Sequence, residues 1–164
     1  CLQSAMSDAF DRLLAALNIY SEAPRVQHEA HAMQIGELCV QVKSTLVSEA
    51  MSVQLKRGSR NRRQYRLSEF DVLVHLGMML DSDDIVCLHV IPISELLLRG
   101  LVGQPRLAGN FRLYPPWARP IRMKGKESQA WQAEYFFDPK KLLYDRHDQG
   151  RFLGILNRCR VMRE

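Results

Sequence analysis

The chain has 164 residues, enough for one compact domain with its own core, and it contains no apolar run of membrane-spanning length. With 46% hydrophobic and 25% charged residues the composition is that of an ordinary globular protein, and a net charge of +5 favours anionic partners. The four cysteines form no Cys-x-x-Cys pair. We therefore expect reduced thiols in an intracellular, cytoplasmic protein rather than a disulfide scaffold.

The first element is predicted to be a helix, because five apolar residues recur at helical spacing between positions 6 and 17. Asn18 is expected to end this helix. Residues 27–35 alternate loosely between apolar and polar side chains, and residues 38–46 alternate clearly, with a Gly-Glu turn between them. These two segments predict a β-hairpin.

A strongly basic segment comes next. Residues 56–66, KRGSRNRRQYR, hold six basic side chains and no acidic one, which predicts a loop or flexible arm. The apolar runs 70–76 and 85–91 predict two buried strands. The run 94–102, SELLLRGLV, is typical of a helix that begins with a serine cap.

The last third of the chain is less regular. Residues 111–120, FRLYPPWARP, predict an ordered loop after a short strand, and residues 131–137, WQAEYFF, favour a strand. Residues 140–144 and 151–158 predict short helices. The order of elements indicates a fold that mixes helices and strands, of the α/β or α+β class.

The strand at 38–46 carries an unusual polar face. Val40 and Val42 alternate with Gln41 and Lys43, so that one face is apolar and the other holds an amide and an ammonium. A half-exposed strand with a solvated face explains this pattern simply. Metal-assisted phosphodiester hydrolysis explains it too, since that reaction uses an acid, an oxygen ligand and a nearby lysine. Glu29, in the first limb of the hairpin, supplies the acid.

An acidic residue, a short turn and then VQVKS resembles the core of the PD-(D/E)XK nuclease superfamily, in the variants where glutamine replaces the second acid. The elements up to about residue 100 fit the αβββαβ core of that superfamily. The resemblance implies a restriction-endonuclease-like fold, with a mixed sheet flanked by helices. It also implies a single nuclease-like domain over 1–164, with a core at about 5–100 and an extension at about 101–164.

The resemblance also assigns roles to residues. Glu29 is then the first metal ligand, Gln41 the second through its amide oxygen, and Lys43 the catalytic lysine. Many members carry a further acid on the leading helix, for which Asp8 or Asp11 is the nearest candidate; we take Asp11 as the candidate third ligand. The implied cofactor is Mg²⁺ or Mn²⁺.

Basic residues predict the contact with nucleic acid. Arginine forks and lysines pair with phosphates, and an exposed tyrosine can stack on a base. The candidates in the basic segment are Lys56, Arg57, Arg60, Arg62, Arg63, Tyr65 and Arg66. A second, looser cluster contains Arg112, Arg119, Arg122, Lys124 and Lys126. The alternative for the basic segment is a charged loop with no partner.

Three hypotheses follow. The first is a metal-dependent DNA endonuclease, for which we consider a homodimer, located with the nucleoid and independent of membranes. The second is an inactive nucleic-acid-binding module on the same fold, because Gln41 is neutral and Glu29 stands where the superfamily usually has aspartate. The third is a protein-interaction domain that uses residues 96–101 and the Pro-Trp segment.

Overall fold

The computed structural model describes residues 2–22, 32–55, 63–104 and 110–161, and it contains a five-stranded and a two-stranded sheet. The strand order in the larger sheet is β1-β2-β4-β5-β7. Strands β2 and β4 are parallel, and every other neighbouring pair is antiparallel. The strands of the larger sheet are β1 (Ala32–Ile35), β2 (Leu38–Leu46), β4 (Val72–Met78), β5 (Ile85–Pro92) and β7 (Phe136–Phe137).

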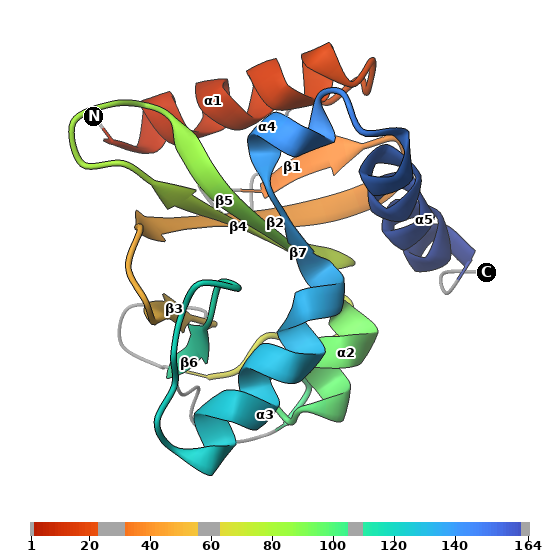
Figure 1. The fold of residues 1–164 in the computed structure, drawn as a ribbon. Coiled ribbons are helices and arrows are strands. Elements are labelled where there is room, and N and C mark those ends of the chain that lie inside the picture. The colour runs from red at the N-terminus through yellow and green to blue at the C-terminus, as the bar shows by residue number, and fades with distance from the viewer. Residues whose placement is uncertain (1, 23–31, 56–62, 105–109, 162–164) are drawn as a thin grey trace.

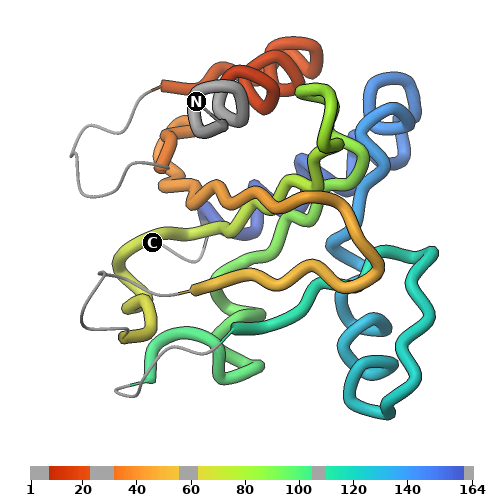
Figure 2. The backbone as a smooth tube through the Cα atoms, turned by 90° about the vertical axis from the view of Figure 1, so that its left-hand side faces the viewer, coloured from red at the N-terminus to blue at the C-terminus, as the bar shows by residue number. Residues whose placement is uncertain are grey.

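The smaller sheet pairs β3 (Met51–Gln54) with β6 (Asn110–Leu113) in antiparallel register. Figure 2 shows the chain leaving β2, turning, and returning beside it as β3. The helices are α1 (Leu2–Ala16), α2 (Ile93–Leu98), α3 (Met123–Gln132), α4 (Pro139–Leu142) and α5 (Arg146–Val161), with a 3-10 turn, η1 (Ala133–Tyr135), after α3. The fold is therefore a mixed α+β fold with a mostly antiparallel sheet flanked by helices, as the sequence predicts.

Figure 1 shows α1 and α4 on one side of the larger sheet, and β3, β6, α2 and α3 on the other. Leu14 of α1 and Val40 of β2 are completely buried, as are Val90 of β5 and Leu96 of α2. The core thus extends through both layers around the sheet. None of the helices in the described residues is both long and apolar enough to cross a membrane.

Local sequence explains the first elements. The apolar stripe of α1 buries Phe10 and Leu14 against the core, and Asn18 follows the helix with a φ of 57°. The amide of Ile19 then donates to the carbonyl of Leu14 at 2.8 Å, which closes the helix end. The hairpin turns at Gly36, whose φ of 60° is the left-handed conformation that glycine adopts without strain. The predicted leading helix is confirmed, and so is the hairpin over residues 32–46; residues 27–31 of its first limb lie outside the described residues.

Two predictions about local structure are wrong, and two elements were not predicted. Residues 131–137 do not form a strand: they complete α3, pass through η1 and contribute only the two residues of β7. Helix α3 and strand β3 are additional elements that the sequence did not indicate. Helix α2 begins at Ile93, after Pro92, without a side-chain cap, so the predicted serine cap is absent. Strand β3 is short and is stabilised by pairing with β6, which lies far away in the sequence. Its local pattern of apolar residues therefore does not reveal it.

Candidate functional site

The polar face of β2 faces the layer that contains β3. In the pairing register with β4, Lys43 lies opposite His75, and Thr45 lies opposite Gly77. Gly77 in turn pairs with Cys87 of β5, whose thiol donates to the sulfur of Met51 at 3.8 Å. Because side chains alternate between faces, the lysine and the histidine share the face that β3 covers. The chain thus buries polar groups between its two sheets.

Lys43 lies on this face in a half-buried position. Its ammonium donates to the hydroxyl of Tyr65 at 3.3 Å and lies 5.7 Å from the centre of the tyrosine ring. Tyr65 is only 2% exposed and packs edge-on against Phe70, with 5.2 Å between ring centres. A rigid, buried phenol therefore holds the lysine, which restricts its side chain and reduces its hydration.

Gln41 lies two residues before Lys43 on the same face, as predicted. Its side chain is 2% exposed, and its Nε2 has no hydrogen-bond partner in the part of the chain that the structure describes. A buried N–H that makes no hydrogen bond costs about 1–3 kcal/mol, so its presence in a core strand calls for an explanation, and a bound ligand is one. The pair of Gln41 and Lys43 is the strongest indication of a binding or catalytic site in this sheet.

Two buried histidines extend the polar face, and the sequence analysis missed them. His75 and His89 are opposite each other on β4 and β5, with 6.0 Å between ring centres. The ring Nε2 of His75 lies 2.9 Å from the hydroxyl of Thr45. Both rings are fully buried, and neither nitrogen of His89 has a partner among the described residues.

Burial keeps both rings neutral. Desolvation, aided by the neighbouring His89, lowers the pKa of His75 to about 3. Desolvation alone lowers the pKa of His89 to about 4. The sequence signal was one histidine inside each of two apolar, strand-like runs, and a buried polar residue is more informative than an exposed apolar one.

Comparison with known proteins shows the family of this chain. Residues 43–138 match the sequence profile of the MepB-like family, which is more than half of the chain. The chain belongs to the MepB-like family. The matched segment begins at Lys43 and includes both buried histidines, but Glu29 and Gln41 precede it.

This MepB-like protein was also compared with solved structures. A crystal structure of MepB is similar with a TM-score of 0.53 and 19% identity, over 65% of this chain and 75% of that one. A bacterial homing endonuclease is similar with a TM-score of 0.48 and 20% identity, over 79% of this chain and 87% of that one. No curated protein sequence matches the chain. At these identities the likeness to MepB concerns the fold alone.

The predicted acidic ligands are not all placed by the structure. Glu29 lies outside the described residues, so its role stays a prediction. Asp11 accepts a hydrogen bond from the hydroxyl of Ser21 at 2.9 Å, which ties α1 to the segment after it. Asp8 is exposed. Among the described residues no group of three or more histidine, cysteine or acidic side chains could hold a metal ion.

Asp71, which directly precedes β4, is a buried acidic residue that the sequence analysis overlooked. The Oδ2 of Asp71 accepts a hydrogen bond from the backbone N–H of Cys39 at 2.6 Å, and the N–H of Asp71 donates to the carbonyl of Cys39 at 2.8 Å. These bonds fix the beginning of β2 to the segment that enters β4. The carboxylate therefore sets the position of the strand on which Gln41 and Lys43 lie.

The basic segment is only partly described. The candidates Lys56, Arg57, Arg60 and Arg62 lie outside the described residues. Arg63 uses both terminal nitrogens to contact the carboxylate of Glu69, at 2.9 and 2.8 Å. Tyr65 contacts Lys43 from the core instead of presenting its ring to solvent, whereas Arg66 is exposed. Of the three described candidates, Arg66 has the guanidinium that solvent reaches most freely.

The surface proposed for protein interaction is divided between core and solvent. Leu96 is fully buried, but Leu98 is 73% exposed. Trp117 is half exposed and packs edge-on against Phe136, with 5.9 Å between ring centres. The short helix α2 therefore contributes Leu96 to the core and presents Leu98 to solvent, so only part of the predicted segment can contact a partner.

Proposed function

We propose that this MepB-like protein is a metal-dependent nuclease that hydrolyses phosphodiester bonds in DNA at a site around Lys43. The observation that supports it is the arrangement of Gln41 and Lys43 on one buried face of β2. A buried amide with an unpartnered nitrogen and an ammonium held by a buried phenol form a polar site that suits an anionic substrate.

Each residue has a role in this proposal. The ammonium of Lys43 contacts the negative charge that develops on the phosphate, and the hydroxyl of Tyr65 positions that ammonium. Gln41 provides an amide oxygen to the metal. The carboxylate ligand of the proposal is Glu29, the acid that the sequence motif assigns to this role. When bound, a divalent metal supplies Lewis-acid stabilisation and an activated water.

The neutral side chain of Gln41 favours a second function. Gln41 carries no charge, so the site has less negative charge than a pair of acids would give a metal. A nucleic-acid-binding module without catalysis is consistent with that feature. It predicts binding that weakens with salt and no cleavage in any divalent metal.

The test uses supercoiled plasmid with the wild-type protein and with Lys43→Ala, in Mg²⁺, in Mn²⁺ and in EDTA. Lys140→Ala is the matched control, because Lys140 is an exposed lysine on α4. We expect nicking or linearisation that requires metal, with the rate reduced at least about 100-fold in Lys43→Ala and unchanged in the control. Cleavage by Lys43→Ala at the wild-type rate would refute the site. Binding without cleavage by the wild type would select the second function.

A further inference from the structure

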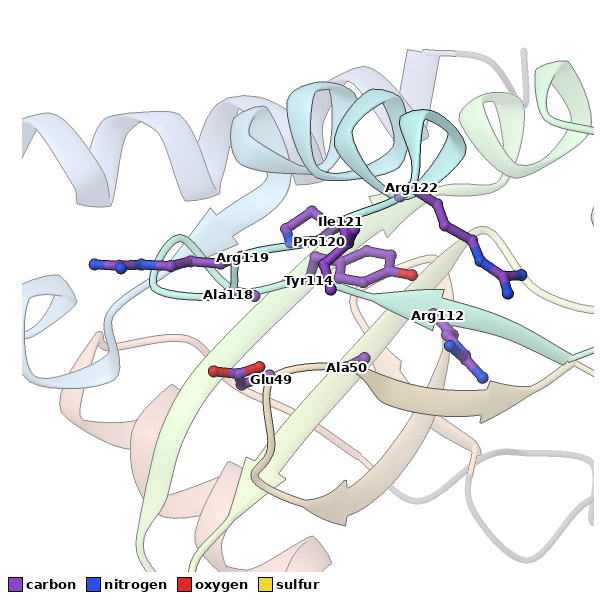
Figure 3. A pocket seen from close by; sticks show the side chains of 10 residues that line it. Glu49, Ala50, Arg112, Tyr114, Ala118, Arg119, Pro120, Ile121 and Arg122 are labelled. Atoms are coloured by element: carbon purple, nitrogen blue, oxygen red, sulfur yellow. The ribbon is translucent and has the colours of Figure 1, made fainter.

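A second polar region lies on the outside of the molecule, over β6 and the beginning of α3. Two adjoining hollows of about 410 and about 520 Å³ open there, and both are lined by Arg112, Tyr114, Arg122 and Gly125. Figure 3 shows Arg112 and Arg122 on the same side of Tyr114, with Arg119 at the other end of the first hollow. We call this region the basic hollow.

The basic hollow carries an excess of positive charge. Its lining contains five cations against two carboxylates, those of Glu49 and Glu127; the cations are Arg99, Arg112, Arg119, Arg122 and Lys124. Arg99 is bound to the carboxylate of Glu95 at 2.7 Å. In the described part of the chain, the other four cations form no ion pair. Exposed charges left without counter-ions in a concave surface attract an anionic ligand.

Buried hydrogen bonds fix the backbone that carries these arginines. Gln132, which is buried at the end of α3, accepts from the N–H of Tyr114 at 2.7 Å and donates to the carbonyl of Arg112 at 2.8 Å. The Nε2 of Gln129 donates to the carbonyls of Pro115 and Ala118, at 2.9 and 2.8 Å. Helix α3 thus holds both β6 and the loop that follows it.

The contact between the helix and the loop is close. A Cβ at Gly125 would lie 2.8 Å from the Cβ of Pro120 and 3.3 Å from the hydroxyl of Tyr114, so only glycine fits there without a shift. Gly125 lets the start of α3 approach the floor of the basic hollow. The arginines therefore project from a rigid scaffold, which lowers the entropy that ligand binding must offset.

We propose that the basic hollow is a second nucleic-acid-binding surface, which holds the phosphate backbone of a DNA strand. Guanidinium groups at Arg112, Arg119 and Arg122 match phosphate oxygens, and their distribution over two adjoining hollows suits successive phosphates better than one small anion. Tyr114 and Ile121 add apolar surface for the sugars between phosphates. This inference concerns binding alone and does not depend on cleavage at Lys43.

The test measures binding of a short fluorescein-labelled DNA duplex by anisotropy, in EDTA, over a range of KCl concentrations. The variant is Arg112→Gln with Arg122→Gln, which leaves the backbone bonds of β6 and α3 in place. The control is Lys140→Gln with Arg146→Gln, which removes the same charge from exposed positions on α4 and α5. Figure 1 shows α4 on the opposite side of the sheet from α3.

We expect the hollow variant to bind about tenfold more weakly than the control variant, and the slope of log affinity against log salt to fall by about 2. Equal affinities and slopes for the two variants would overturn the proposal. Competition by poly-glutamate as strong as by unlabelled duplex would overturn it as well, since the surface would then select acidic chains in general. Because EDTA prevents metal-dependent cleavage, a failure here leaves the proposed reaction at Lys43 to be judged by the plasmid assay.

Discussion

The polar face of the larger sheet and the basic hollow differ in how deeply their polar side chains are buried. On the sheet, polar groups lie in the core: Gln41 is 2% exposed, and the rings of His75 and His89 are fully buried. In the basic hollow, the guanidinium groups of Arg112 and Arg122 remain in water, and only the backbone beneath them is buried. A buried polar group gains strong interactions with a substrate but reduces stability, whereas an exposed one adds affinity at little cost to the fold.

The largest expected effect of this difference is on stability in acid. His75 and His89 stay neutral in the folded protein down to their pKa values of about 3 and about 4. In the unfolded chain both bind protons near pH 6.5, so the unfolded state binds more protons below that pH. Between about pH 7.5 and pH 5 we expect the free energy of unfolding to fall by about 4 kcal/mol from these two groups.

Urea denaturation at each pH measures that loss. His89→Phe keeps a ring in contact with Phe136 and removes one titrating group, so the loss should fall by about half. His147→Phe is the control, because His147 is exposed on α5. An identical pH dependence in wild type and His89→Phe would contradict the burial that the structure shows.

A smaller effect is expected at the scaffold of the basic hollow. Gln132→Met removes the buried amide that bonds Tyr114 and Arg112, and leaves one backbone N–H and one carbonyl without their partner. We expect the free energy of unfolding to fall by about 2–4 kcal/mol. Urea denaturation against Gln54→Met, an exposed glutamine on β3, is the measurement. A loss in Gln132→Met no greater than in the control would show that the hydrogen bonds of Gln132 do not stabilise the fold.

The smallest effect concerns the partner of Lys43. Tyr65→Phe retains the buried ring against Phe70 and removes only the hydroxyl that accepts from the ammonium. We expect cleavage to slow by about tenfold, the value of one hydrogen bond to a charged group, with little change in stability. Tyr135→Phe is the matched control, since Tyr135 is a buried tyrosine that donates to Glu95 at 3.4 Å. If both variants cleave at the same rate, Tyr65 has no role in positioning.

Much of the fold could be predicted from local pattern. The apolar stripe of α1, the alternation in β2 and the apolar runs of β4 and β5 each reflect one face or both faces buried in the core. Helix α3 could not, because MKGKESQAWQ has no continuous apolar stripe and its position depends on hydrogen bonds from Gln129 and Gln132. Pairing of β3 with β6 joins segments far apart in sequence, which periodicity does not reveal.

Only part of the candidate site could be predicted from the sequence. Alternation placed Gln41 and Lys43 on one face, and the structure agrees. The contact between Lys43 and Tyr65 was not foreseen, because it depends on where the end of the basic segment packs against the sheet. The histidine pair was overlooked because His75 and His89 meet only through the register of β4 and β5. Glu29 stays a prediction from the sequence.

The central claim is that chemistry and binding are located in separate regions, at Lys43 and at the basic hollow. One experiment compares Lys43→Ala with the Arg112→Gln, Arg122→Gln variant, measuring DNA binding in EDTA and single-turnover plasmid cleavage in Mg²⁺ at saturating protein. Our account predicts that Lys43→Ala binds normally but does not cleave. It predicts that the double variant binds weakly but cleaves normally once saturated. Loss of both properties in both variants would contradict it.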